Sequence, residues 1–576
     1  MFRFLLLSLL IVIDLCSLPG QSAGISPRAL AYLDSHDKVP ILIYLKKQAD
    51  LSAVKPEWTK LQKGTFVYQA LQECSSSSQS RIIDFLELNQ VAYKSFFIVN
   101  CVQAYLRADQ LSHLSQMSEV AALLFDESVQ LTPVMDKTLL QIHARAPEIT
   151  WGIKSIHADE VWDLGYEGQG VTVAGEDTGI KWDIPAIKDK YRGWNDTSVS
   201  VDHNYNWHDA IHTISPLSGD SINPCGLNLL APCDDHGHGT HTIGTITGHS
   251  SEHAIGVAPK SKWIGCRNME RGNGAPSTYI ECFEFFLAPT DLEQRKPRID
   301  LAPAVINNSW YCSEEEGCDP SNWNIMERVV STLKIAGIVV VASAGNNGNT
   351  CGTIANPISM FESAFSVGSY ASNDTISGFS SCGPVVVDSS LRIKPNIVAP
   401  GSEVISQLPD LSYQAWSGTS MAGPHVAGVV ALMISANPSL LGQVEKIESI
   451  LEQTAEPTSS LITCAGSATD DIPNIMYGYG KINALRAVLK AKSLVGIDDK
   501  TFKSWQVVPN PGKELISLNM PVAEDVLLIY NLLGQLVLST PISAQDRILP
   551  DLTGLNSGLY HLILQKSGYQ TSWVKQ

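Results

Sequence analysis

Three short segments of the chain hold the residue types that nucleophilic acyl transfer requires. Asp177 directly follows the apolar run 171–174, His238 stands in the stretch HGHGTH at 236–241, and Ser420 lies near the start of an Ala- and Gly-rich segment. A serine hydroxyl becomes a good nucleophile when an imidazole takes its proton and a carboxylate orients that imidazole. A carboxylate at the carboxyl end of a parallel strand lies where α/β sheets place their sites. These segments therefore predict acyl-transfer chemistry.

The histidine cluster allows a second interpretation. His236, His238 and His241, together with Asp234 and Asp235, are residue types that bind metal ions. However, the H-E-x-x-H pattern is absent, and no second cluster of ligands stands out in the sequence. We therefore favour the catalytic interpretation and predict no metal-binding residue.

The serine segment, residues 417–428, reads SGTSMAGPHVAG. Its small residues allow a helix to pack closely against its neighbours, and Pro424 falls in the early turns, where its missing N–H costs little. We expect a buried helix whose N-terminus points at the site. The backbone N–H of Ser420 could then help to stabilise an oxyanion.

These motifs resemble the signatures of the subtilisin-like serine proteases, the subtilases. The strings GTSMAGPHVAG, HGTHTIGT and DTG match the serine, histidine and aspartate signatures, and the chain order Asp, His, Ser is the order of that family. VINNSW, FFLAPTD and KWDIPAIKDKYRGWN resemble the bacillopeptidase F-like branch. The resemblance covers about residues 151–495. It implies a doubly wound parallel α/β sheet and an endopeptidase that hydrolyses peptide bonds in proteins through an acyl-enzyme.

The resemblance also implies a role for each motif residue. Ser420 is expected to be the nucleophile, His238 the general base and then acid, and Asp177 the group that orients the imidazole. Asn346, in the segment SAGN, matches the side-chain oxyanion donor. No cofactor is required for this chemistry. The residues expected to bind substrate are Ser309, Trp310, Tyr311 and Gly345.

One position departs from the family pattern. Glycines usually follow the serine equivalent to Ser309, whereas this chain continues with Trp310, Tyr311 and Cys312. A large side chain there would narrow the pocket for the residue before the scissile bond, so we expect a preference for small or otherwise restricted side chains. The alternative is that Tyr311 points to solvent. Many relatives bind structural calcium, but a D-x-D-x-D-G loop is absent and no calcium ligands are predicted.

The start of the chain predicts export. Residues 1–23 combine a short positive start, a brief apolar core and a small-residue end, which is typical of a secretory signal peptide. A buried strand is the alternative interpretation. No later run reaches the roughly 18 apolar residues of a membrane-spanning helix. We therefore expect a secreted or cell-surface protein.

The next parts of the chain predict a protease precursor. Residues 24–132 read as a small α+β unit of ferredoxin-like type and resemble the inhibitory propeptide of subtilases. Residues 133–149 form the expected processing linker, with the cleavage junction between Leu131 and Thr150. Residues 150–495 hold the expected catalytic domain, in which strands and helices alternate.

Residues 499–576 have a different character. Short apolar runs separated by turn residues predict an all-β sandwich. The strings VVPNPGKELISL, YNLLGQLV and LNSGLYHLIL resemble the C-terminal sorting domain of proteins exported by the type IX secretion system. A generic adhesive or substrate-binding β-sandwich is the alternative. The apolar runs lie at 526–530, 535–538 and 559–564.

Apolar patterns predict individual elements. Asp109 is expected to cap one helix, the serine run after Glu73 to break a longer one, and Pro438 to open a third. The expected strands are 39–45, 95–106, 120–125, 171–174, 304–306 and 338–342.

Composition and cysteines narrow the class of protein. Fifty-eight acidic against 40 basic residues give a net charge of −18, which argues against nucleic-acid binding. Of 12 cysteines, Cys16 falls in the expected signal peptide, and export permits disulfides in the rest. No CxxC pair supports a zinc site. The pairings expected from short spacing are Cys225–Cys233, Cys312–Cys318 and Cys351–Cys382.

Three functions are compatible with these patterns. The leading one is an autoprocessed, secreted serine endopeptidase. Its expected partners are protein or peptide substrates, its own propeptide and the secretion machinery, and we expect it to be a monomer. The second is a peptidase specialised for processing one partner. The third is a surface-exposed binding protein that keeps the fold without turnover. The complete set of Asp177, His238, Asn346 and Ser420 favours an enzyme.

Overall fold

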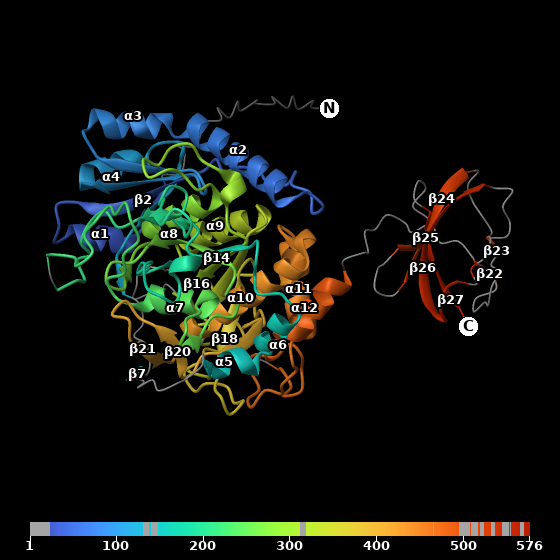
Figure 1. Cartoon of the computed structure of the whole chain (residues 1–576). Helices are drawn as coiled ribbons and strands as arrows, with labels where there is room; N and C mark the ends of the chain where they lie inside the picture. Colours follow the sequence, from blue (N-terminus) through green and yellow to red (C-terminus); the bar gives the residue numbers. More distant parts are fainter. Residues whose placement is uncertain are drawn as a thin grey trace, which may run out of the picture. The chain divides into compact units, whose positions relative to one another are not determined.

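The computed structural model of the chain forms two compact units, Met1–Lys492 and Ser493–Gln576, which are described separately (Figure 1). The residues that the structure describes are 23–130, 137–139, 148–219, 221–310, 318, 320–464, 466–494, 507–508, 517–518, 524–531, 536–543, 552, 554–564 and 570–575.

A seven-stranded parallel sheet is the centre of the first unit. Continuous apolar runs form its strands, and nearly all of their side chains are buried because helices cover both faces. In spatial order the strands are β12 (Trp207–Asp209), β14 (Lys262–Arg267), β9 (Thr172–Asp177), β16 (Val305–Asn308), β17 (Val339–Ser343), β18 (Phe365–Tyr370) and β19 (Ile397–Pro400). The predicted doubly wound parallel sheet is confirmed.

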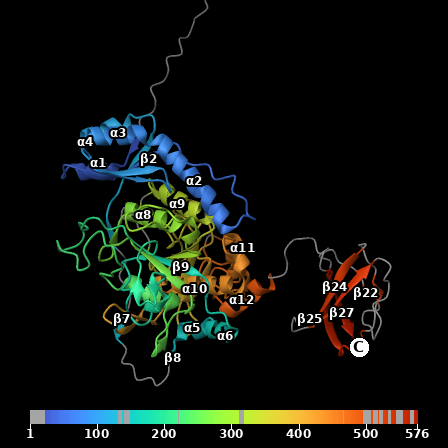
Figure 2. The same cartoon turned by 45° about the horizontal axis from the view of Figure 1, so that its top comes forward.

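Two pairs of helices cover the two faces of this sheet (Figure 2). α8 (Pro276–Leu287) and α9 (Trp323–Ile335) lie on the face toward the N-terminal part of the chain, whereas α7 (His238–Thr247) and α10 (Thr419–Ala436) lie on the other. By length and composition α10 could cross a membrane, but 89% of it is buried inside this unit, as expected for a core helix.

Shorter elements surround the core. They are α5 (Trp151–Ser155), α6 (Ala158–Asp163), α11 (Val444–Thr454), α12 (Ala484–Ser493), η1 (Lys188–Lys190), η2 (Ile299–Leu301), η3 (Pro438–Leu440), β8 (Glu148–Ile149), β10 (Trp194–Asn195), β11 (Ser200–Val201), β13 (His253–Ala254), β15 (Asn273–Gly274), β20 (Val404–Gln407) and β21 (Tyr413–Trp416).

The N-terminal part forms its own sheet with the order β1-β5-β2-β4-β3. β2, β3, β4 and β5 pair antiparallel, and β1 joins the edge parallel to β5. The elements are β1 (Gly24–Ile25), α1 (Pro27–Leu33), β2 (Val39–Leu45), α2 (Lys60–Ser78), α3 (Ser80–Leu88), β3 (Tyr93–Phe96), β4 (Cys101–Leu106), α4 (Ala108–Ser115) and β5 (Val120–Phe125).

Four element predictions are corrected by the structure. The run 95–106 is a hairpin of two strands, because residues 97–100 turn. The serines after Glu73 do not break α2, since their hydroxyls donate to carbonyls three or four residues back and remain compatible with a helix. Asp109 lies inside the first turn of α4, whose N-cap is Arg107. Pro438 opens only the short η3, because Gly442 (φ +85°) interrupts the chain before α11.

The N-terminal part and the catalytic sheet share a hydrophobic core. Leu42, Val67 and Phe96 belong to the same buried cluster as Phe283 and Val330, which lie on α8 and α9. Two lysines of α2 extend this contact: Lys60 Nζ donates to Ala302 O and Lys63 Nζ to Gly442 O, each over 2.8 Å. The N-terminal part is therefore docked on the sheet-covering helices through both its sheet and α2.

The second unit contains a four-stranded antiparallel sheet with the order β25-β24-β26-β27 and a two-stranded ribbon, β22–β23. Its buried cluster includes Leu527, Leu562 and Trp573. The all-β prediction agrees with this sheet, and the sandwich arrangement stays a prediction. The strands are β22 (Val507–Val508), β23 (Ser517–Leu518), β24 (Glu524–Asn531), β25 (Leu536–Ser543), β26 (Gly558–Leu564) and β27 (Gln570–Lys575).

The disulfides agree only in part with the predicted pairs. Cys225–Cys233 is confirmed. Cys351–Cys382 is wrong, because Cys351 bonds to Cys464 while Cys382 is a buried free thiol. The bond Cys266–Cys282, which joins β14 to α8, was not predicted. Cys318 is disulfide-bonded, and its predicted partner Cys312 lies outside the described residues.

Candidate active site

Asp177 and His238 form a buried hydrogen-bonded pair. Asp177 ends β9, and His238 is the first residue of α7. Nδ1 of His238 lies 2.8 Å from Oδ1 and 2.9 Å from Oδ2 of Asp177. The backbone N–H of Thr178 donates to Oδ1 over 2.7 Å. A ring nitrogen held by a carboxylate in this way fixes the orientation of the imidazole and leaves Nε2 for proton transfer.

Glycines allow α7 to begin this close to the carboxylate. Gly237, the N-cap, has a left-handed φ of +98°. A Cβ on Gly239 would lie 2.1 Å from the carbonyl oxygen of Gly179 and 2.9 Å from Cβ of Asp177. Any side chain at residue 239 would push α7 away from Asp177. The contact between His238 and Asp177 therefore requires glycine at residue 239.

Ser420 lies in the first turn of α10. Its hydroxyl donates to the carbonyl of Ser309 over 3.0 Å, and the Ser309 hydroxyl donates to the carbonyl of Ser420 over 2.8 Å. These two bonds tie the start of α10 to the end of β16. α10 also packs against α7. Ser420 and His238 therefore lie near the N-termini of two helices that contact each other. The predicted buried helix at the serine segment is confirmed.

Asn346 is held by the residue before Ser420. Its Oδ1 accepts from both the backbone N–H of Thr419 (2.9 Å) and the Thr419 hydroxyl (3.0 Å). The carboxamide oxygen is therefore occupied, and the Nδ2 group is oriented away from Thr419. Gly345, at φ +106°, shapes the turn and donates its N–H to the Thr419 hydroxyl over 3.2 Å.

Thr419 was missed by sequence reasoning, although it organises this corner. Its carbonyl accepts from the hydroxyl of Ser343 over 2.9 Å, in addition to its two bonds to Asn346. Position 419 lies inside the recognised serine motif, so a motif reading assigns it no role. Only the packing of α10 against β17 reveals that Thr419 links the end of β17, at Ser343, to the turn that holds Asn346.

The residues predicted to bind substrate are placed differently from one another. Ser309 contacts Ser420, and Gly345 contacts Thr419, so both adjoin the serine. Trp310 is only 1% exposed and stacks on Tyr279, with ring centroids 3.9 Å apart. Its indole is thus part of the core behind the strand. Tyr311 lies outside the described residues.

The other members of the histidine cluster serve structural contacts. Asp234 accepts from Thr178 and from the hydroxyl and N–H of Thr240. His241 stacks on Trp416 at 4.8 Å, and burial lowers its pKa to about 3, helped by the neighbouring His238. Within the described ranges, no group of three or more His, Cys, Asp or Glu side chains is arranged to hold a metal ion.

Two short strands on either side of residues 131–136 pair with strands of the catalytic part. The first lies near the end of the predicted propeptide, and the second lies in the predicted processing linker. β6 (Val129–Gln130) pairs antiparallel with β15, with Gly274 opposite Val129. β7 (Lys137–Leu139) pairs antiparallel with β21, with Trp416 opposite Lys137. β21 ends four residues before Ser420, so the chain on both sides of 131–136 is bound as added strand.

Comparison with known proteins decides the family. Residues 168–480 match the subtilase family, and residues 506–575 match the secretion system C-terminal sorting domain. The chain belongs to the subtilase family. It is thus a subtilisin-like serine endopeptidase with a C-terminal sorting domain for export.

The curated relatives are bacterial proteases. The chain is 35% identical to bacillopeptidase F of Bacillus subtilis (strain 168) over 459 residues, which cover 77% of this chain but only 29% of that protein. It is 29% identical to serine protease AprX of the same organism over 418 residues, 68% of this chain and 79% of that protein. It is 30% identical to subtilisin DY of Bacillus licheniformis over 314 residues, 54% of this chain and 92% of that protein.

Proposed function

We propose that this subtilase is made as a precursor and hydrolyses peptide bonds in proteins with Asp177, His238 and Ser420 as its catalytic triad. The observation that carries the proposal is the buried bond between Asp177 and Nδ1 of His238, placed at the N-terminus of a helix that packs on the helix of Ser420. Asp177 orients the imidazole so that Nε2 faces the serine side.

In the proposed reaction, Nε2 of His238 takes the hydroxyl proton as Ser420 Oγ attacks the scissile carbonyl carbon. The hydroxyl must first turn away from the Ser309 carbonyl, to which it now donates. The imidazolium then gives the proton to the leaving amine, and an acyl-enzyme remains. Water repeats the sequence and releases the second product.

The oxyanion of each tetrahedral intermediate would be stabilised by two donors. These are the backbone N–H of Ser420, at the start of α10, and Nδ2 of Asn346. Support comes from Thr419, which occupies Oδ1 of Asn346 and so fixes which end of the carboxamide is left as donor. No cofactor takes part in these steps. Structural calcium, common among relatives, is assigned no ligand.

We place the autoprocessing cut within residues 131–136. This narrows the span from Leu131 to Thr150 that the sequence allowed. Support comes from the strands on either side. β6 pairs the residues before this segment with β15, and β7 pairs the residues after it with β21, which ends four residues before Ser420. A substrate bound as added strand on both sides presents its intervening peptide bonds to the nucleophile.

The N-terminal part, residues 24–132, would act as the propeptide and as an inhibitor, because it stays docked through a shared hydrophobic core. Residues 1–23 would direct export from the cytoplasm, and the sorting domain would direct the final step to the cell surface or medium. We propose a monomer that takes protein or peptide substrates, with restricted side chains before the cut because of Tyr311.

A fluorophosphonate probe tests the proposed function. The wild-type chain, after its N-terminal part has been released, should become covalently labelled, and Ser420→Ala should not. The variant must show the same circular dichroism as the wild type, so that loss of labelling reports the nucleophile rather than unfolding. A folded wild type that resists labelling would instead support the alternative of a binding protein with this fold.

A further inference from the structure

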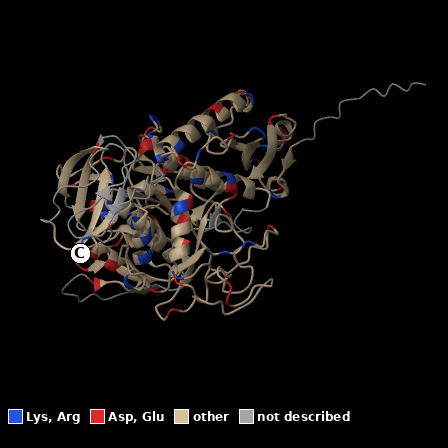
Figure 3. Ribbon diagram, turned by 90° about the vertical axis from the view of Figure 1, so that its right-hand side faces the viewer, with Lys and Arg blue, Asp and Glu red and all other residues tan. Residues whose placement is uncertain are grey.

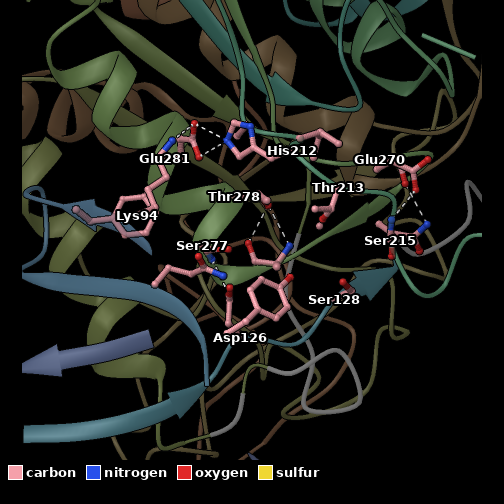
Figure 4. Close-up of a pocket in the computed structure, with 18 residues that line it drawn as sticks. Lys94, Asp126, Ser128, His212, Thr213, Ser215, Glu270, Ser277, Thr278 and Glu281 are labelled. Atoms are coloured by element: carbon pink, nitrogen blue, oxygen red, sulfur yellow. Dashed lines mark hydrogen bonds and ion pairs between the residues drawn. The ribbon is translucent and has the colours of Figure 1, made fainter. Parts of the chain in front are cut away.

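A buried carboxylate joins three basic side chains across the docking face of the N-terminal part. Glu281 of α8 is 5% exposed and forms an ion pair with Lys94 of β3. His208 Nε2 lies 2.6 Å from Oε1 of Glu281, and His212 Nε2 lies 3.0 Å from Oε2. Figure 4 shows Lys94 and His212 approaching Glu281 from opposite sides. We call Lys94, Glu281, His208 and His212 the interface cluster.

The members of the interface cluster come from both sides of the contact. Lys94 belongs to the N-terminal part, whereas the carboxylate and both histidines belong to the catalytic part. The cluster borders a cavity of about 140 Å³ between the two parts. Its charge balance therefore bears directly on whether the N-terminal part stays docked.

The carboxylate keeps its charge in mild acid. Burial alone would raise the pKa of Glu281, but the hydrogen bonds from His208 and His212 and the charge of Lys94 hold that pKa well below its usual value. Acid therefore changes the cluster through the imidazoles. Lys94 and Glu281 alone balance in charge, whereas a positive charge on His212 puts two cations on one carboxylate.

We propose that the interface cluster is a proton-sensitive latch: when His212, which shares Glu281 with His208 and Lys94, carries a positive charge, it repels Lys94 and releases the N-terminal part from the catalytic face. This inference rests on the proposed function only in that release uncovers the active site.

Linkage gives the sign of the effect. Hydrogen bonds with Glu281 raise the pKa of His212, while the charge of Lys94 lowers it. Undocking removes Lys94, so the undocked form binds the proton more tightly than the docked form. Docking must then weaken as the pH falls through the pKa of the undocked cluster, near the range in which histidine titrates.

Two neighbouring carboxylates titrate with the opposite sign. Glu284, one helical turn along α8, accepts from the backbone N–H groups of Phe97 and Ile98 of the N-terminal part. Burial raises its pKa to about 8 in the docked chain, so its contribution favours docking in acid. Asp126 of the N-terminal part accepts from the backbone N–H of Ser277 over 2.9 Å, and burial raises its pKa, so it also favours docking in acid. Glu270, which also lines the cavity, is held by Ser218 and Arg271.

The latch is tested by hydrogen–deuterium exchange on the full chain. Ser420→Ala prevents cleavage, and Glu284→Gln removes the titration of Glu284 while keeping an acceptor for the two N–H groups. Exchange of β3 and residues 97–100 is measured at about pH 5 and pH 7.5 and corrected for the intrinsic pH dependence of exchange. Protection should fall roughly tenfold or more in acid.

Two variants in that background decide the outcome. Burial lowers the pKa of Lys60 to about 7 in the docked chain, so Lys60 also weakens docking in acid and contributes equally in every variant. His208→Gln with His212→Gln should reduce the loss of protection, and so should Lys94→Met, which removes the repelled charge. Equal protection at both pH values in the parent chain would overturn the latch, as would a loss of the same size in the parent chain and in both variants. Protection of the β16–β17 pairing in the catalytic sheet serves as the control for general unfolding.

An activity measurement separates this inference from the proposed function. If the chain is a protease, the lag before wild-type activity appears should shorten in acid, and the two-histidine variant should lose that shortening. If the wild type never becomes active, the proposed function fails while the exchange result still decides the latch.

Discussion

Both carboxylate oxygens of Asp177 lie within 2.9 Å of one ring nitrogen of His238. A single nitrogen shared by two acceptors, in a site from which water is excluded, leaves the imidazole little freedom to rotate. The reactivity of Ser420 should therefore depend on residue 177 more than on any charge at the surface.

Asp177→Asn should lower kcat roughly 10⁴-fold, the loss typical when the orienting carboxylate of such a triad is replaced. The amide can donate to Nδ1 and stabilise the wrong tautomer. Initial rates on a chromogenic peptide, with the matured enzyme titrated by active site, would measure this. Asp183→Asn, which removes an exposed carboxylate paired with Lys181, is the matched control and should leave kcat unchanged.

Asn346→Ala should lower kcat about 10²- to 10³-fold with little change in KM, because the lost donor acts only on the developing oxyanion. Asn347→Ala, at the exposed next residue, should have a small effect. Steady-state kinetics on the same peptide separates the two constants. A rise in KM alone for Asn346→Ala would contradict the assignment of Asn346 as an oxyanion donor.

Tyr311→Gly should broaden the side chains accepted before the scissile bond, since glycine is usual at this point in the family. A peptide library randomised at that position, digested by the wild type and the variant, measures the change by mass spectrometry. Equal cleavage after Phe, Leu and Arg by the wild type would show that Tyr311 does not narrow the pocket.

Removing the bond between Cys351 and Cys464 should destabilise the first unit more than removing the one between Cys225 and Cys233. The sequence separations are 113 and 8 residues. The chain-entropy model then gives about 4–5 and about 2–3 kcal/mol. Paired Cys→Ser variants of the Ser420→Ala chain, compared by calorimetry, test the order. A larger loss of Tm for the short loop would contradict it.

Glu284 should make docking of the N-terminal part weaker in alkali. Its pKa is raised to about 8 by burial when docked, against a usual value of 4.5. A raised pKa stabilises the docked form fully below the lower value, and that stabilisation is lost as the pH rises through the higher one. In Ser420→Ala, exchange protection of residues 97–98 should fall between about pH 6 and pH 9, and Glu284→Gln should remove that slope.

The parts of the fold that the sequence predicted correctly are those with continuous apolar runs. β9, β16 and β17 are buried on both faces and therefore carry an unbroken signal. The serine run in α2 misled the prediction because hydroxyls that can leave a helix can also bond back to it. The sequence does not show that Gly442 separates η3 from α11. The reason for glycine at this position is the backbone of Lys60, which lies against it in the folded chain.

Contacts between distant segments were the main omission. The Cys266–Cys282 bond requires α8 to lie on β14, and the choice of Cys464 over Cys382 requires two loops to meet. The spacing of the cysteines along the sequence indicates neither of these contacts. The histidine and serine motifs located His238 and Ser420, but the role of Thr419 in turning Asn346 follows only from the packing of α10.

The two lysines of α2 have a consequence for timing. Lys60 donates a hydrogen bond to the main-chain carbonyl of Ala302, and Lys63 donates one to that of Gly442. Both acceptors are far from the segment 131–136 in the sequence. A nick in that segment leaves both anchors intact. Under the proposed function, cleavage of the chain and dissociation of the N-terminal part would therefore be separate steps. The cleaved molecule would stay inactive until its N-terminal part dissociates or is degraded.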